Sequence, residues 1–446
     1  MRSLARPDDG VHSFFTDRAQ TIVESLIDPK ALDGLTAPFQ GSRTAPNFKL
    51  PTVLWLGVFG AANAVMHSMK AILEAACDAI EGSRILPLER HTLTQSGWTR
   101  AKQRLSLGLL VRVWRHWVET ARCLAGDAAL FHGLRLVAID NTSLTVPEAL
   151  WPVFRSHKGG RGDGPAQGTL QVAYDVCARV PVAFTAAKAD SSEKTLNRRL
   201  LCDITVPSLL LIDCGFYSIR LFADVRRRGH HFLTRMRSSG RPKLVRRLAP
   251  DDGLYEIRPG SSWGKLPPDV PKRMIVRIVH AQWKGFRPVR LVTSLLDAEA
   301  VPRTELLDLY HRRWHVETFF RELSGDVEFE HWHTRTLKGF YVELLFILIY
   351  TTMVRAHMAE AATRAGVLPG HLRFGDGAQQ CERTWVRLGK TPRPQHPALL
   401  DELTTYLSKL KVDIRPGRSF ERDKQKRRAA SRSHKLEALK EKEHAA

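Results

Sequence analysis

The segment Leu306–Ser324, LLDLYHRRWHVETFFRELS, constrains the fold more than any other part of the sequence. It contains no proline or glycine, and its apolar residues fall on nearly every side of a helical projection. A helix that is apolar all round is usually buried, so the pattern predicts one helix inside the core. Four of its polar residues are spaced as helical neighbours and form one stripe. They are Tyr310, Arg313, Glu317 and Arg321.

Glu317 is the residue of this helix that most needs an explanation. A carboxylate inside a core is costly unless a cation or a metal ion meets it. Arg313 lies one turn earlier, and an internal ion pair is the simplest interpretation of an isolated Arg-x3-Glu. Two further acids favour a second interpretation, in which Glu317 helps to bind a metal ion, because each of these acids ends a predicted buried strand. These strands are LRLVAID, ending in Asp140, and SLLLID, ending in Asp213.

The chain carries a large positive charge. Lys and Arg number 68 against 46 Asp and Glu, which gives a net charge of +22 and a pI of about 10.1. A surplus of this size favours a polyanionic partner, with nucleic acid first and an anionic membrane second. The six cysteines form no C-x-x-C pair, which argues against a structural zinc site and a disulfide framework. His331 and His333 have no third ligand nearby, so we interpret them as surface residues.

Membrane and export signals are weak in this sequence. The longest apolar run, Leu344–Tyr350, is too short to span a bilayer. The first residues, MRSLARPDDG, lack the apolar core of a signal peptide. We therefore expect a cytoplasmic, nucleoid-associated protein with no membrane partner.

The residues up to about 125 predict helices, among them a short one with a basic side. This short segment, SGWTRAKQRL, follows the candidate caps Thr94 and Ser96. Its apolar residues share one face, and its basic residues point elsewhere. Trp98, Ala101 and Leu105 form the apolar face, and Arg100, Lys102 and Arg104 form the basic side. Such a helix suits a DNA backbone or groove, although a solvated basic face explains the charge equally well.

Strand patterns continue after the first acid. Thr169–Val176 and Pro181–Ala187 predict an antiparallel pair. The Gly-rich loop before them lacks the order of a phosphate-binding P-loop. Its basic residues remain candidates for phosphate contact. They are Arg155, Lys158 and Arg161.

The last third of the chain changes character three times. Short alternating runs broken by Pro and Gly, from about Arg237 to Leu296, predict a β-rich insertion. A long apolar helix is predicted at Gly339–Ala365. The tail from Asp413 is basic and poor in apolar residues, which predicts disorder until it binds a partner.

Three carboxylates are therefore candidates for one site: Asp140, Asp213 and Glu317. If the two strands are parallel neighbours, their carboxyl ends meet where open α/β sheets place their sites. Three acids within about 4–6 Å repel one another, and such a cluster is stable around divalent cations. Oxygen ligands alone suit Mg²⁺ or Mn²⁺, and a pair of these ions promotes in-line phosphoryl transfer. With the positive charge, the expected substrate is a nucleic-acid phosphodiester.

Several motifs resemble those of bacterial insertion-sequence transposases of the DDE type, the family numbered four and its relatives. LLLIDCGFYS resembles the D-x-G-F segment, and YHRRWHVETFF resembles the Y-x2-R-x3-E signature. LVAIDNTSL is similar to the first motif, with Asn141 in the place of Gly. SGWTRAKQRLS resembles the N-terminal DNA-binding segment. The resemblance spans roughly Leu50 to Ala365.

The resemblance implies an α/β fold: an RNase H-like mixed sheet flanked by helices, a β-rich insertion and an α-helical N-terminal DNA-binding domain. The implied domains are residues 1–125 (helical, DNA-binding), 126–236 (catalytic core, first part), 237–300 (β-rich insertion), 301–365 (catalytic core, second part) and 366–446 (helical region and basic tail).

The resemblance also assigns roles. Asp140, Asp213 and Glu317 become the catalytic residues that bind Mg²⁺, with Mn²⁺ as a substitute. Tyr310 and Arg313 become residues that hold the DNA end near the scissile phosphate. In relatives a Trp of the insertion stacks on a flipped base, and here the candidates are Trp283 and Trp263.

One position departs from the family pattern. Ser324 stands where the family has a Lys, seven places after the Glu that Glu317 matches, and Arg321 is the candidate substitute. We expect a DNA transposase that hydrolyses transposon ends, transfers the strand into target DNA and acts as a homodimer on double-stranded DNA. The alternatives are a catalytically inactive DNA-binding relative and a stand-alone Mg²⁺-dependent nuclease.

Overall fold

The computed structural model describes most of the chain. The described residues are 50–63, 68–80, 94–126, 130–154, 166–189, 193–237, 240–259, 267–282 and 288–412. The chain divides into two units, Met1–Lys411 and Val412–Ala446. Everything below concerns the first unit, since the second lies outside the described residues except for Val412.

The strands, in chain order, are β1 (Arg135–Thr145), β2 (Gln167–Asp175), β3 (Val180–Lys188), β4 (Ser208–Ile212), β5 (His231–Arg235), β6 (Lys243–Ala249), β7 (Asp252–Ile257), β8 (Met274–Ala281) and β9 (Val289–Thr293). The α-helices are α3 (Leu50–Ala62), α4 (Met69–Ile80), α5 (Gln95–Arg104), α6 (Leu107–Ala125), α7 (Glu193–Asp203), α8 (Ile219–Arg227), α9 (Arg303–His311), α10 (His315–Gly325), α11 (Leu337–Ala365), α12 (Phe374–Lys390) and α13 (His396–Ser408). Short 3₁₀ turns are η4 (Glu148–Leu150), η5 (Cys214–Phe216), η7 (Arg312–Trp314), η8 (Pro369–His371) and η9 (Arg393–Gln395).

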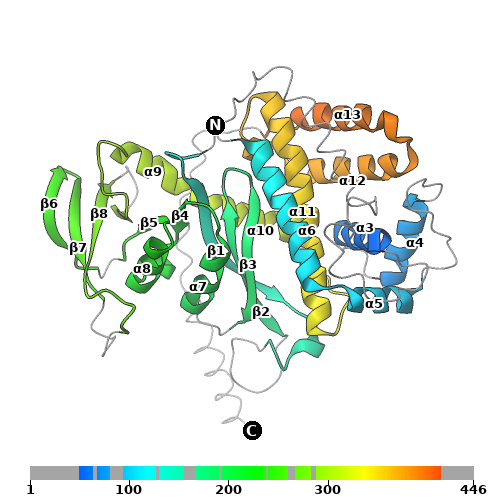
Figure 1. Cartoon of the computed structure of the whole chain (residues 1–446), viewed down its shortest axis with the longest axis horizontal. Helices are drawn as coiled ribbons and strands as arrows, with labels where there is room; N and C mark the ends of the chain where they lie inside the picture. Colours follow the sequence, from blue (N-terminus) through cyan, green and yellow to red (C-terminus); the bar gives the residue numbers. More distant parts are fainter. Residues whose placement is uncertain are drawn as a thin grey trace, which may run out of the picture. The chain divides into compact units, whose positions relative to one another are not determined.

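The described strands form one mixed sheet in the order β3-β2-β1-β4-β5-β9-β8-β7-β6 (Figure 1). β1, β2 and β3 are antiparallel, which confirms the predicted strand pair. β4 is parallel to β1 and β5 is parallel to β4. The connections run through α7 and α8, as parallel neighbours require a crossover. β4 is buried throughout and β1 is buried from Leu136 to Ile139, as their apolar sequences predict.

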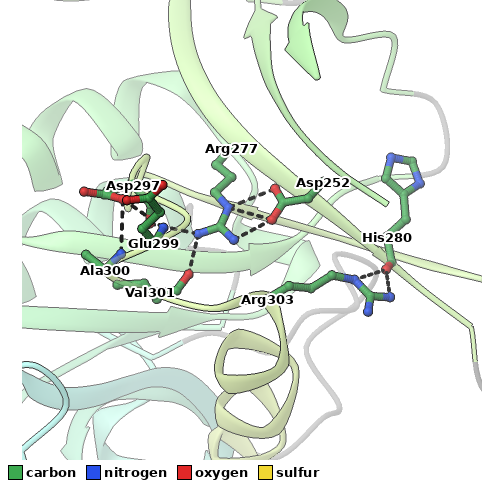
Figure 2. Close-up of polar contacts among 8 residues, drawn as sticks. All are labelled: Asp252, Arg277, His280, Asp297, Glu299, Ala300, Val301 and Arg303. Carbon is green, nitrogen blue, oxygen red and sulfur yellow. Dashed lines mark hydrogen bonds and ion pairs between the residues drawn. The ribbon is translucent and has the colours of Figure 1, made fainter. Parts of the chain in front are cut away.

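The β-rich interval does not stand apart from this sheet. β9 pairs with β5, and β8, β7 and β6 follow it edge to edge in antiparallel register. The guanidinium of Arg277 on β8 is fully buried and binds both carboxylate oxygens of Asp252 on β7 (Figure 2). It also donates to the carbonyl oxygens of Asp297 at 3.1 Å and Val301 at 2.6 Å. Since Val301 lies two residues before the start of α9, one arginine joins the outer strands to the beginning of that helix.

Two long helices lie side by side next to β3: α6 and α11 (Figure 1). α6 is amphipathic, with Trp114 and Trp117 buried. α11 is, within the described part of the chain, the one helix long and apolar enough to cross a membrane by length and composition. However, 72% of its most apolar window is buried inside the fold, which is also what the core helix of a soluble protein shows.

The sequence predicts one helix over Leu306–Ser324, and this prediction is wrong. The 3₁₀ turn η7 separates α9 from α10, and the side chain of Trp314 in this turn is 44% exposed. Leu306, Leu309, Val316, Phe319, Phe320 and Leu323 are buried. The tighter turn interrupts the α-helical geometry. The buried positions nevertheless continue at spacings of three and four residues through Arg313, so both halves bury the same face.

Candidate active site

Asp140 and Asp213 are neighbours because β1 and β4 are parallel. The last residues paired between these strands are Ile139 and Ile212, and the residues that follow them are Asp140 and Asp213. Asp213 follows the end of β4 as predicted, and its carboxylate accepts a hydrogen bond from the backbone N–H of Gly215 at 3.0 Å. Asp140 does not end β1. That expectation is wrong, because β2 continues to pair with β1 as far as Thr145.

A single guanidinium joins all three predicted acids. Arg313 Nη1 donates to Asp140 Oδ2 at 3.0 Å, and Arg313 Nη2 donates to Glu317 Oε1 at 2.8 Å. Arg313 Nε lies 3.9 Å from Asp213 Oδ1. The Arg313–Glu317 pair therefore exists, but it is not a remote structural pair, because both aspartates meet the same side chain.

The carboxylates differ in exposure. The side chains of Asp140, Asp213 and Glu317 are 17%, 39% and 37% exposed, whereas Arg313 is 7% exposed. The expected deep burial of Glu317 is thus wrong, because its side chain is partly open to solvent although Arg313 of the same stripe is buried. Burial raises the pKa of Asp140 to about 6, against the opposing effects of the Asn141 backbone N–H and Arg313. The site is a half-open acidic cluster around a buried cation.

Tyr310 lies beside the same cluster. Its hydroxyl donates to the carbonyl oxygen of Ile212 at 3.4 Å, directly before Asp213. Burial, with a smaller contribution from Asp213, raises the pKa of Tyr310 to about 12. Arg321, the fourth member of the stripe, is exposed and donates to Thr318 Oγ1 at 3.1 Å. It lies on the solvent side of α10.

The short helix α5 has the predicted apolar face but a smaller basic side. Thr94 caps it by accepting from the N–H of Gly97 at 3.0 Å. Trp98, Ala101 and Leu105 are buried, and Arg100 and Arg104 are exposed. Lys102 corrects the expectation: it is buried, and its Nζ lies 2.6 Å from Glu343 Oε1 of α11. Its long side chain crosses to α11 instead of facing solvent.

Some predicted residues lie outside the described part of the chain. These are Trp283 and Trp263 of the β-rich interval, the loop residues Arg155, Lys158 and Arg161, and the tail from Asp413.

A buried ionic cluster that the sequence analysis missed holds α10 in place. The carboxylate of Glu322 binds the guanidinium of Arg355 on α11 and lies 3.9 Å from Arg179 Nη2 in the β2–β3 turn. Arg355 and Arg179 are both buried. An arginine in the middle of so apolar a helix as α11 is the sequence signal that points to such a partner.

The donor set of the three acids fits a hard divalent cation, which prefers carboxylate oxygens. Among the described residues, however, no three acidic, histidine or cysteine side chains are spaced to hold a metal ion as they stand. At this site the nitrogens of Arg313 contact all three carboxylates instead.

Comparisons with known proteins agree on a class. Residues 131–353, half of the chain, match the model of the transposase DDE domain. The chain therefore belongs to the DDE transposases, enzymes of polynucleotidyl transfer that act on DNA with the help of divalent metal ions. Within this family it is similar to an IS4 transposase. The transposase InsG for insertion sequence element IS4 of Escherichia coli (strain K12) is 25% identical over 350 residues, 76% of this chain and 78% of that protein.

A solved structure shows a looser similarity. It is the cryo-EM structure of a piggyBac transposase synaptic complex with hairpin DNA, with a TM-score of 0.42 and 11% identity. The alignment covers 94% of this chain and 90% of that chain.

Proposed function

We propose that this DDE transposase hydrolyses phosphodiester bonds at the ends of its insertion sequence and transfers the freed strand into target DNA, with Asp140, Asp213 and Glu317 as metal ligands. One observation carries this assignment. Acids from β1, from the end of β4 and from α10 meet one guanidinium within 2.8–3.9 Å. Residues 73 or more positions apart in the chain converge in this way only through the fold.

We propose an RNase H-like core for the same region. The support is the strand order β3-β2-β1-β4-β5, with three antiparallel strands followed by two parallel ones. The domain boundaries at residues 125, 236, 300 and 365 belong to this proposal, as does an N-terminal helical DNA-binding domain.

Mg²⁺ is the proposed metal, with Mn²⁺ as a substitute, because the ligands are carboxylates alone. When bound, the metal supplies a Lewis acid and activates water for the attack on phosphorus. The protein's own contribution is positional. The parallel pairing of β1 and β4 fixes the two aspartates, and the bond from Tyr310 to Ile212 holds α9 against the end of β4.

The proposed partner is double-stranded DNA, bound by a homodimer in the cytoplasm. Arg100 and Arg104 on α5 are exposed and suit phosphate contacts, and Arg321 is exposed on α10 beyond the acids. Tyr310 and Arg313 are the proposed contacts to the DNA end. Trp283 keeps its proposed role in base stacking, and Lys102 is left out because its charge is paired inside the protein.

The decisive experiment is a nicking assay on DNA that carries the element's own ends. Asp213→Ala should abolish Mg²⁺-dependent nicking and leave DNA binding within about twofold, because the lost carboxylate holds metal and not phosphate. Asp308→Ala, an exposed acid on α9, is the matched control and should keep full activity. Nicking by the Asp213→Ala protein would refute the assignment.

Ser324 favours one alternative, an inactive DNA-binding relative, because this exposed residue of α10 supplies no cation where the family has a Lys. That protein would bind the ends but would not nick them. A stand-alone nuclease would nick DNA but would fail to join a pre-cut end to a target.

A further inference from the structure

We propose that Arg313 is an internal counter-ion that competes with divalent cations for the three carboxylates, so that metal binding requires this side chain to leave them. The inference rests on the proposed metal-binding role of Asp140, Asp213 and Glu317. It adds a residue that sets how tightly, and in what order, the site is filled.

The contacts of Arg313 use the atoms that a metal needs. Its two terminal nitrogens bind Asp140 Oδ2 at 3.0 Å and Glu317 Oε1 at 2.8 Å, and its Nε lies 3.9 Å from Asp213 Oδ1. Carboxylate oxygens bind Mg²⁺ at about 2.0–2.1 Å, so the ion and the guanidinium require the same space. Two cations in that space also repel each other.

Deprotonation of Arg313 cannot relieve this competition. An arginine side chain keeps its charge at any working pH, so it is removed from the cluster only by moving. Arg313 belongs to the 3₁₀ turn η7, between two helices that are anchored on either side. Its guanidinium lies 5.1 Å from the ring centroid of Trp314, which is 44% exposed. The inference requires the side chain to rotate away from the acids, and this exposed ring offers it a cation–π contact as it does so.

A displaced Arg313 gains a new use. A guanidinium binds phosphate oxygens with paired hydrogen bonds, and the proposed substrate brings a phosphate to these acids. A DNA phosphate that holds Arg313 would therefore favour metal binding, and metal would favour the phosphate contact. The two ligands are coupled through one side chain.

The test is a Mn²⁺ titration of the full chain, with free Mn²⁺ followed by electron paramagnetic resonance. Arg313→Gln removes the competitor and should tighten binding at least tenfold, equivalent to about 1.4 kcal/mol. Arg321→Gln removes the same charge from the exposed face of the same segment and should change the affinity less than twofold. Arg313→Lys, with a single ammonium for three acids, should tighten binding less than Arg313→Gln does.

Unchanged or weaker Mn²⁺ binding in Arg313→Gln overturns the inference, because a guanidinium that merely organises the acids would leave them splayed when removed. Should that variant fail to fold, Arg313→Lys decides the question: tighter Mn²⁺ binding supports the inference, and unchanged or weaker binding overturns it. Asp213→Asn separates this failure from that of the proposed function. If Asp213→Asn binds Mn²⁺ like the unsubstituted protein, the metal assignment itself is wrong.

Discussion

Asp140 lies among apolar neighbours and next to a guanidinium, and these surroundings act on its carboxyl in opposite directions. Burial is the larger effect and raises its pKa to about 6 from 3.8. The folded protein therefore holds this proton more tightly than the unfolded chain does. By linkage, the free energy of unfolding falls as the pH rises from 3.8 to about 6, and it stays reduced above that range.

Asp140→Asn should remove this dependence, because an amide cannot ionise. We expect the variant to be more stable than the unsubstituted protein by about 2–3 kcal/mol at pH 8. The difference should vanish near pH 4. Urea unfolding at the two pH values measures it, and equal stability at pH 8 would show that Arg313 fully offsets the cost of burial.

At this scale the sequence predicted that three acids distant in the chain would lie together, as they do around Arg313, but it predicted their surroundings poorly. Asp140 and Asp213 each follow the apolar run of a strand, so any fold that pairs β1 with β4 in this register brings them together. Arg313 was identified from its helical spacing to Glu317. Lys102 was misplaced because a helical projection cannot reveal a partner 241 positions away, Glu343. Long-range partners are a property of packing.

Among the elements, the strands with strong apolar runs were predicted, and the departures came at their ends. β1 continues past Asp140 because its second neighbour, β2, still offers hydrogen bonds there. The segment Leu306–Ser324 was predicted as one helix because it contains no proline or glycine. The turn η7 interrupts it at the position from which Arg313 contacts three acids. Neither feature has a local sequence signal.

The joint between β7, β8 and the start of α9 allows a test at the level of elements. Arg277→Met should lower the free energy of unfolding by about 3–5 kcal/mol, because it leaves the carboxylate of Asp252 buried and unpaired. The double variant Asp252→Leu/Arg277→Met should recover part of that loss. Urea unfolding of all three proteins measures it, and a double variant less stable than Arg277→Met alone would contradict the explanation.

For the molecule as a whole, the net charge of +22 predicted a polyanionic partner, and the fold decides which charges remain available. On α5 the basic residues differ in burial, since Arg100 and Arg104 are exposed whereas Lys102 is buried against Glu343. This division makes an internal control for DNA binding.

Arg100→Gln/Arg104→Gln should weaken DNA binding and make the negative slope of log affinity against log salt shallower by about 2, if each contacts one phosphate. Lys102→Met should leave that slope unchanged and should lower the stability of the fold by about 3 kcal/mol, since it leaves Glu343 without its cation. Fluorescence anisotropy on labelled DNA at several salt concentrations gives the slopes. A shallower slope for Lys102→Met would mean that its ion pair opens on DNA.

The continuous sheet limits how such a chain can change in length. β9 pairs with β5, and the chain then continues into α9. The strands β8 and β9 therefore connect the part of the sheet that ends in Asp213 to the segment that carries Arg313 and Glu317. The hairpin of β6 and β7 lies beyond it and pairs only through β8. Residues can therefore be inserted at the β6–β7 turn without reaching the site. A deletion that removes β7 would take Asp252 from Arg277 and loosen the start of α9, which leads to Arg313 and Glu317.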